Sequence, residues 1–477
     1  VKVLEHPIYT NGIDFTTLYF DSSTVPQDKL GYVYLLSSIL GNVDTKNYSK
    51  DDLNEQILIN TGGITISPGF IVNHDDNNLY SPKMVVSFMP LNENLNSGFN
   101  ILNEMIFNSS LNDKARLKEI ISNLKLEKEQ RMAYSGNIMG SEKLLSYMSE
   151  SGKYNAYKNN GLYSLLCDLD KNFDSKSDEI IKNLQQVRNL IFNKKDMIAS
   201  FTGNEENYKT FSDNLNKFSA NLKNENLQKY KYIFDSSKIN EGLIIPSTVQ
   251  YVYKGGNLKK SGYTENGKFK VLQNILNTGY LSPIIREKNG AYGAGMGVSN
   301  GDVIFSSYRD PNLEKTIDTF DKTPEYLKSF SADEKQMMNY IIGAVGQDDN
   351  KYSQLAQYYG PAADGILADD LYLSGIKQSD LEKDRQELIS TTAEDIRNFA
   401  TIMDAVLKQN YLCVVGGETK IKENKKNFMI IKNVLTSEEE RGNAIDMEKK
   451  ENVPSVQKDG TAAKLIAPTD MEFVIQK

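Results

Sequence analysis

The sequence is poor in the residues on which catalytic and metal sites most often depend: it has two histidines, two cysteines and no tryptophan among 477 residues. His6 and His74 each stand alone, so neither an H-E-x-x-H nor an H-x-x-E-H zinc helix can exist. A nucleophilic triad also needs a placed histidine, and neither histidine is at a plausible turn. We therefore expect no metal site on this chain. His74 precedes two aspartates and is expected to be a solvated loop residue, with a metal ligand as the alternative interpretation.

Cysteine and long apolar runs are scarce as well. Cys167 and Cys413 lie within short apolar runs, which predicts buried reduced thiols and excludes a disulfide framework or a Cys-type zinc site. No apolar run approaches the ~18 residues that a membrane-spanning helix needs. Residues 1–7 carry no signal-peptide pattern. These absences favour a cytoplasmic protein with no membrane partner.

An excess of basic charge is also missing. The 55 basic and 63 acidic residues are interspersed and give a net charge of −8, which argues against a general nucleic-acid partner. Residues 416–420 have the sequence Gly-Gly-Glu-Thr-Lys, without the spacing of a Walker A loop. The glycine cluster at 290–297 has no G-x-G-x-x-G register and leads into a predicted strand. Dinucleotide binding is therefore not expected.

What the sequence does contain is the same order of elements twice. A chain of 477 residues is too long for one core, because cores stop growing near roughly 250–300 residues. The first copy predicts strands and helices at Ile13–Phe20, Lys29–Leu40, Asp51–Asn60, Ile64–Val72, Lys83–Met89, Leu95–Phe107, Asp113–Arg131 and Met197–Thr202. The second copy predicts them at Ser247–Tyr253, Phe269–Leu276, Gly290–Ser299, Asp302–Tyr308, Leu313–Phe330, Ala332–Ala344 and Tyr411–Val415.

The two copies correspond at specific points. Met197–Gly203 matches Tyr411–Gly416, and Leu111–Glu129 matches Phe330–Asp348. The sequence therefore predicts an α+β protein of two tandem related domains, each a mostly antiparallel sheet with helices packed on one face. We place these domains at 1–225 and 226–435. Residues 436–477 predict a charged, extended tail, in which Met471–Ile475 is a possible edge strand.

The most informative segment is Tyr280–Gly295, with the sequence YLSPIIREKNGAYGAG, followed by Ser-Tyr-Arg-Asp-Pro-Asn at Ser307–Asn312. It resembles the C-terminal half of the pitrilysin (insulinase) family of inverzincin metalloproteases, in the branch of the presequence proteases and falcilysin. In that family an arginine and a tyrosine six residues apart lie at the end of a helix and the start of a glycine-rich strand. Here these positions are Arg286 and Tyr292.

The resemblance implies a fold and a function. Such enzymes are clamshells of two halves, each with two related α/β domains, which enclose a chamber for unfolded peptides. The N-terminal half carries the zinc helix, and this chain resembles the other half. The resemblance therefore implies a zinc-free half that works with a zinc-bearing N-terminal partner, from the same precursor or as a separate subunit.

The chemistry of the two residues fits that role. Attack of water on a peptide carbonyl builds negative charge on its oxygen, and the phenol of Tyr292 can donate a hydrogen bond to it. The guanidinium of Arg286 can hold a substrate carbonyl or share the developing charge. From spacing alone, the plain alternative is a hairpin with a surface ion pair.

Other residues of the segment are candidates for substrate binding. Gly290, Gly293 and Gly295 would let a peptide backbone approach closely and pair as an added strand. Tyr308 and Arg309 are further candidates, although the following Pro-Asn indicates a helix start, so that a structural turn is the other interpretation.

Two other functions stay open at the level of sequence. One is a catalytically silent subunit of the same fold, which binds peptides or acts as a scaffold. The other is a peptide-binding module without any zinc partner. Retention of Arg286 and Tyr292 favours the catalytic interpretation over both.

Overall fold

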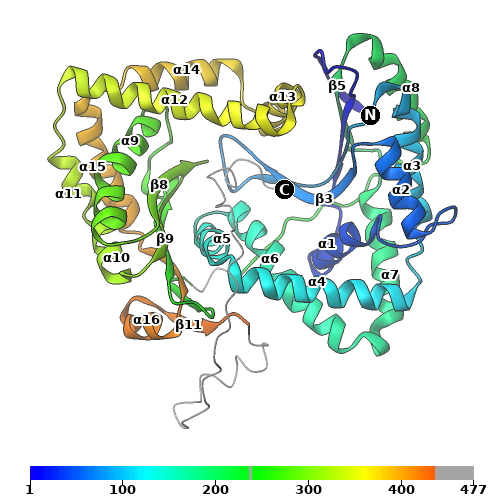
Figure 1. Ribbon diagram of the computed structural model, residues 1–477, viewed down its shortest axis with the longest axis horizontal. Coiled ribbons are helices and arrows are strands. Elements are labelled where there is room, and N and C mark those ends of the chain that lie inside the picture. Colours follow the sequence, from blue (N-terminus) through cyan, green and yellow to red (C-terminus); the bar gives the residue numbers. More distant parts are fainter. Residues whose placement is uncertain (236–238, 436–477) are drawn as a thin grey trace, which may run out of the picture.

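The computed structural model describes residues 1–235 and 239–435, and its strands form two sheets, one from each half of the chain (Figure 1). The first sheet has the order β1-β5-β2-β4-β3, and only its β1–β5 pair is parallel among the described strands. Its strands are β1 (Lys2–Pro7), β2 (Phe15–Asp21), β3 (Ile64–Val72), β4 (Tyr80–Phe88) and β5 (Ile198–Gly203). The predicted tail 436–477, with its possible strand, lies outside the described residues.

The second sheet has the order β11-β6-β10-β7-β9-β8. Strand β6 pairs in parallel with β10 and β11, and the remaining pairs are antiparallel. The strands are β6 (Glu241–Ile244), β7 (Gln250–Asn257), β8 (Gly293–Ser299), β9 (Asp302–Asp310), β10 (Tyr411–Gly416) and β11 (Ile430–Asn433). The glycine-rich strand β8 is therefore an edge strand.

Helices of the first half begin where side chains can cap them. Ser49 and Asp113 accept hydrogen bonds from the backbone N–H groups of Asp52 and Arg116 in the first turns of α2 and α4. The helices are α1 (Leu30–Ile39), α2 (Lys50–Asn60), α3 (Leu95–Asn108), α4 (Lys114–Tyr134), α5 (Gly136–Met148), α6 (Glu150–Lys171), α7 (Phe173–Ile191) and α8 (Tyr208–Ala220).

Helices of the second half correct two predictions. The single helix predicted at Leu313–Phe330 is two helices, because the chain turns at Lys322 and Pro324 starts the next helix. The helix predicted to end at Ala344 runs on to Tyr359. The helices are α9 (Lys268–Leu276), η5 (Asn277–Lys288), α10 (Leu313–Asp321), α11 (Thr323–Lys328), α12 (Glu334–Tyr359), α13 (Ala362–Ser374), α14 (Gln378–Ile389), α15 (Ala393–Leu407) and α16 (Glu418–Glu423).

Helix α5 of the first half packs on the sheet of the second half (Figure 1). Gly136 and Gly140 of α5 face the rings of Tyr251 and Tyr253 on β7, and an added Cβ would lie 2.7 and 2.6 Å from them. Glycine is therefore needed at both positions for the helix to approach the sheet this closely. Every residue of β7 is buried as a result, since helices cover both of its faces.

Helix α13 of the second half packs in turn on the first sheet. Gly365 lies directly against Thr202 of β5, where no side chain would fit. Four residues later, Asp369 is buried and accepts a hydrogen bond from the Tyr19 hydroxyl, with an oxygen–oxygen distance of 3.0 Å. Its other carboxylate oxygen lies 2.8 Å from His6 Nε2. We call this contact of Asp369, His6 and Tyr19 the α13 dock.

The two halves thus exchange equivalent helices. Helix α5 follows α4 and helix α13 follows α12, and the sequence predicts that α4 and α12 correspond. Each sheet has helices of its own half on one face and a helix of the other half on the opposite face. The predicted α+β class with mostly antiparallel sheets is confirmed. The exchange itself has no signal in the sequence pattern, because it joins residues that are distant in the chain, such as Tyr19 and Asp369.

The polar segment predicted as the boundary between domains is fixed to the first half as far as residue 235. The Tyr232 hydroxyl donates to the carbonyls of Ser22 and Val25 at 3.1 and 2.9 Å. Lys229 pairs with Asp21, at 2.9 Å. The division of the chain at residue 225 stays a prediction.

The cysteines are free thiols in the structure. Cys413 on β10 is buried as predicted, whereas Cys167 on α6 is only partly buried, because one side of α6 lines a cavity between the halves. Over the described residues, no helix combines the length and apolar character that crossing a bilayer requires.

Candidate functional site

Arg286 lies in the last turn of η5, a π-helix that continues α9. π-Helices are rare and often mark functional sites. Leu281 and Ile285 are buried on one side of η5, and the Tyr280 hydroxyl donates to the Thr319 carbonyl at 2.8 Å. These contacts fix η5 against its own half and leave the side chain of Arg286 exposed.

A tight turn joins Arg286 to Tyr292. The N–H of Gly290 donates to the Arg286 carbonyl at 3.0 Å, and the N–H of Ala291 donates to the Ile285 carbonyl at 3.1 Å. Gly290 has a φ of +83°, a conformation in which a side chain would be strained. The predicted placement of the arginine at a helix end and the tyrosine at a strand start is therefore correct. Gly290 serves the turn itself, which is a structural reason for glycine at this position.

Tyr292 is 60% exposed although its backbone is fixed. Its N–H donates to the Tyr308 carbonyl at 3.0 Å, and its ring meets the Tyr308 ring edge-on with centroids 5.9 Å apart. Among the described residues, neither the Tyr292 hydroxyl nor the Arg286 guanidinium has a hydrogen-bond or ion-pair partner. The turn thus presents one phenol and one guanidinium that the chain itself does not use.

Tyr308 and Arg309 belong to a bulge in β9. The pairing of β7 with β9 shifts between Gln250 and Val252, so Tyr251 faces both Tyr308 and Arg309. Arg309 has a φ of +49°, which is strained for any residue but glycine. Its guanidinium carbon lies 5.5 Å from the Tyr308 ring centroid, and the phenols of Tyr308 and Tyr251 raise the pKa of Arg309. Arg309 is therefore occupied by its own neighbours, unlike Arg286.

The face of β8 that carries Gly293, Gly295 and Gly297 is open. An added Cβ would meet nothing within 4 Å at Gly297 and only the Tyr308 Cβ, at 3.9 Å, at Gly293. Packing within the chain therefore does not require glycine at these two positions, and the open face leaves room for a ligand.

The edge of β8 is partly used. The Asn277 side chain donates to the Met296 carbonyl at 3.0 Å and accepts from the Met296 N–H at 2.6 Å. Because backbone groups alternate along a strand, those of Ala294 and Val298 point toward the same edge. An added peptide strand would therefore meet the Asn277 amide in the middle of β8. Sequence reasoning missed Asn277, since a lone polar residue at a helix junction carries no pattern.

Neither histidine is part of a metal centre. His6 is committed to Asp369 in the α13 dock, and His74 is exposed on the β3–β4 hairpin as predicted. Within the described residues, no group of three or more His, Cys, Asp or Glu side chains could hold a metal ion. The donor set needed for a catalytic zinc does not fit this part of the chain.

Comparisons with known proteins agree with this layout. Residues 1–169 match the family of domains associated with subfamily C of the M16 peptidases, and residues 240–419 match the family described as "PreP C-terminal domain". The chain is 36% identical to Protein HypA of Clostridium perfringens, over 91% of this chain and 44% of that protein. It is 27% identical to presequence protease 1 of Arabidopsis thaliana, over 91% of this chain and 40% of that protein. The chain therefore spans less than half the length of these relatives.

Solved structures show the same fold. A peptidase M16 inactive domain from Pseudomonas fluorescens aligns with a TM-score of 0.56 and 14% identity, over 87% of this chain and 94% of that one. A protease from Helicobacter pylori aligns with a TM-score of 0.57 and 12% identity, over 87% and 96%. The chain belongs to the pitrilysin (M16) family of peptidases and corresponds to the C-terminal half of such a protease.

Proposed function

We propose that this chain is the zinc-free half of a peptide-degrading metalloprotease, which closes a clamshell chamber together with a zinc-bearing N-terminal half. The relatives named presequence proteases are more than twice as long as the matched region, so they contain room for such a half. The described residues offer no metal site, and the zinc is therefore assigned to the partner. When bound there, zinc would supply the activation of water for peptide hydrolysis.

The observation that carries this proposal is the pair of unused head groups on a fixed turn. Tyr292 would donate its hydroxyl to the oxygen of the scissile carbonyl as negative charge develops on it. Arg286 would hold a neighbouring carbonyl or share that charge through its planar fork of N–H donors. Because the turn is already held by its backbone hydrogen bonds, little reorganisation would be needed when a substrate arrives.

Unfolded peptides are the substrate class that best suits the surface beside the turn. The open glycine face of β8 would admit a peptide backbone without side-chain clashes. The free backbone groups of Ala294 would pair with it on the Tyr292 side of the Asn277 amide. We assign Tyr308 and Arg309 to the support of Tyr292, with Tyr308 also forming part of the substrate surface.

Reconstitution tests this proposal directly. The chain would be mixed with a zinc-bearing N-terminal half, and cleavage of an unstructured peptide would be followed with and without a chelator. We expect chelator-sensitive cleavage by the mixture and no cleavage by this chain alone. Elemental analysis of this chain alone should find no stoichiometric zinc. One tightly held zinc per chain would contradict the assignment of the metal to the partner.

The same assay separates the catalytic role from the silent subunit. A mixture that cleaves equally well after Arg286 and Tyr292 are both replaced would show that this half only binds or encloses peptides. The likeness to a structure titled as an inactive domain makes that outcome a specific alternative.

A further inference from the structure

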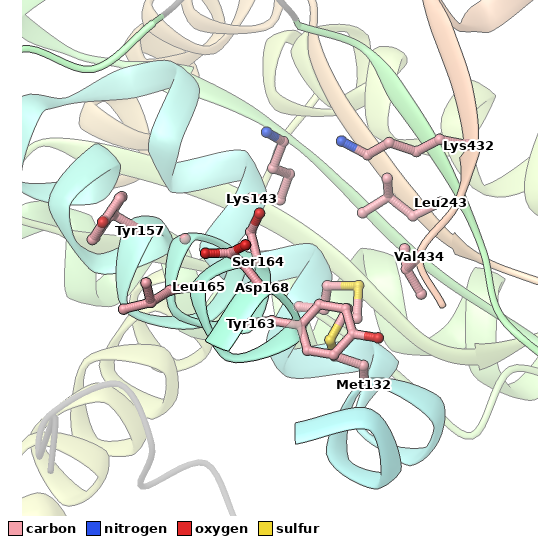
Figure 2. A pocket seen from close by; sticks show the side chains of 12 residues that line it. Met132, Lys143, Tyr157, Tyr163, Ser164, Leu165, Asp168, Leu243, Lys432 and Val434 are labelled. Atoms are coloured by element: carbon pink, nitrogen blue, oxygen red, sulfur yellow. The ribbon is translucent and has the colours of Figure 1, made fainter. Parts of the chain in front are cut away.

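A cavity of about 590 Å³ lies between the two halves, away from the Arg286–Tyr292 turn. Helices α4, α5 and α6 of the first half form one side, and β6 with β11 of the second half form the other. Met132, Met139, Leu243 and Val434 give it an apolar wall (Figure 2). Its volume is in the range of sites that hold small organic ligands.

Next to this cavity, one buried carboxylate serves two lysines. Glu241 at the start of β6 is fully buried, and its two oxygens lie 2.8 Å from Lys143 Nζ and 2.7 Å from Lys432 Nζ. The Tyr147 hydroxyl donates to the same carboxylate at 2.8 Å. Burial alone would raise the pKa of Glu241, but the two lysines hold it below its ordinary value, so the group stays ionised. The cluster therefore carries two positive charges and one negative charge.

The surplus positive charge faces the cavity. Lys143 and Lys432 both line it, with side chains 20% and 32% exposed, and their ammonium groups lie at the same end in Figure 2. Each ammonium has three N–H donors and gives one to Glu241, and the described residues provide no second acceptor for either. Asp168, on another wall, is already paired with Lys176 at 2.6 Å. It therefore does not neutralise the surplus.

We propose that this cavity binds a small monoanion with an apolar body, namely a carboxylate on an aliphatic or aromatic chain. The carboxylate would take the free donors of Lys143 and Lys432, and the body would lie on the methionine and aliphatic wall. Methionine side chains adapt their shape, so the wall would accept bodies of different form. A free fatty acid and the C-terminal residue of an apolar peptide share this chemistry. Since the cavity is built from both halves, its ligand would stabilise them against each other.

Thermal unfolding of the chain alone tests the site and needs neither the zinc half nor catalysis. The probes are octanoate with octanamide as its neutral match, and N-acetyl-leucyl-phenylalanine with its C-terminal amide. We expect octanoate to raise Tm by roughly 1–3 °C at about ten times its Kd, and octanamide to have no comparable effect. Stabilisation by the peptide acid but not by octanoate would assign the site to peptide C-termini. Equal effects of acids and amides, or no effect of any probe, would overturn the proposal.

Charge variants give a sharper test. Lys432→Met leaves one lysine against one carboxylate, so calorimetric affinity for octanoate should fall at least about tenfold. Glu241→Gln leaves two unopposed lysines and should raise the affinity if that variant folds. Lys118→Met removes an exposed lysine that pairs with Asp174 elsewhere, and serves as the matched control. If Lys432→Met does not fold, Lys432→Arg should bind like the wild type and Lys143→Met should not. Unchanged octanoate affinity in a folded lysine-to-methionine variant would exclude the site.

Discussion

The α13 dock and the Arg286–Tyr292 turn both combine a tyrosine with a charged residue, and they differ in whether those groups are paired. In the dock, Asp369 is buried and receives both Tyr19 and His6. At the turn, Arg286 and Tyr292 are exposed and have no partner in the described part of the chain. Buried polar groups must be satisfied within the fold, whereas exposed groups on a fixed backbone remain available to a ligand.

The comparison separates two kinds of consequence. A change in the dock leaves a buried polar group without its partner, so it should reduce stability. A change at the turn removes no contact within the chain, so it should affect peptide cleavage while stability stays constant. The predictions below test this separation, from the largest expected effect to the smallest.

Tyr292→Phe should have the largest effect, in the enzyme reconstituted with its zinc-bearing half. The substitution keeps the ring and its contact with Tyr308 and removes only the hydroxyl. If the hydroxyl meets the developing oxyanion, kcat should fall roughly 10–1000-fold, or about 1.4–4 kcal/mol, with little change in KM. Steady-state kinetics measures this, and Tm should stay within a degree or so of the wild type.

Arg286→Lys is the companion variant at the turn. It keeps the charge but loses the planar fork, so catalysis should still fall. Full kcat in the Tyr292→Phe enzyme would show that the turn is only a structural hairpin, and the comparison with the dock would lose its functional half.

Asp369→Ala should have the opposite signature. It leaves the Tyr19 hydroxyl and His6 without their acceptor at a buried contact, which should lower the free energy of unfolding by about 2–4 kcal/mol. The kcat of the enzyme that remains folded should be close to the wild type. Urea denaturation measures the loss. Asp404→Ala removes an exposed partner of Lys408 on α15 and should cost less than about 1 kcal/mol.

Asp302 marks another contact between the halves, where a buried carboxylate lacks a close cation. It accepts from Asn257 at 2.7 Å and from Ser149 of the first half at 3.1 Å. Burial raises the pKa of Asp302 to about 6, although these two donors and Lys260 act in the opposite direction. The folded protein therefore binds the proton more tightly than the unfolded chain does.

The sign of the pH dependence follows from that raised pKa. The contribution of Asp302 to stability is present in full below pH 3.8 and is lost as pH rises through about 6. Asp302→Asn should remove this part of the dependence. The difference in unfolding free energy between wild type and variant should change by about 1–3 kcal/mol between pH 4 and pH 7. A difference that is constant over this range would contradict the raised pKa.

Arg309→Gly should have a smaller effect and sharpens the role of the bulge. Glycine relieves the strained φ, which offsets the lost contact of the guanidinium with Tyr308, so Tm should change little. In the reconstituted enzyme, kcat should fall about 2–10-fold because Tyr308 holds Tyr292 less firmly. Arg309→Lys, which keeps the charge and the strain, is the control. A rise in KM without a fall in kcat would instead indicate that Arg309 contacts the peptide directly.

The sequence predicted local elements well where one period of hydrophobicity dominates. The predicted strand Ile64–Val72 matches β3 at both ends, and the helix–turn–strand around Arg286 and Tyr292 lies where the resemblance placed it. It missed β1, because Lys2–Pro7 is short, partly polar and exposed in alternation, and pairs only with the distant strand β5. Periodicity carries no information about such distant partners.

The same limit applies to the candidate site. The glycines of β8 and the turn were visible in sequence, whereas the Asn277 amide on Met296 and the left-handed Arg309 depend on how strands and helices meet in space. The α13 dock was equally invisible, since His6 and Asp369 are 363 residues apart. A histidine count predicted what the chain lacks, but it did not predict which histidine is structurally committed.

The two histidines give the last and smallest prediction. His74→Ala should leave both stability and reconstituted activity within error of the wild type, because the side chain is exposed and only its backbone N–H contacts the other half, at the Ser374 carbonyl. His6→Ala removes a partner of the buried Asp369 and should lower the free energy of unfolding by about 1–3 kcal/mol. Thermal unfolding of the pair measures this contrast on one residue type. A loss of cleavage in folded His74→Ala would mean that the hairpin tip serves the active site, and equal stability of the two variants would mean that the α13 dock does not hold the halves together.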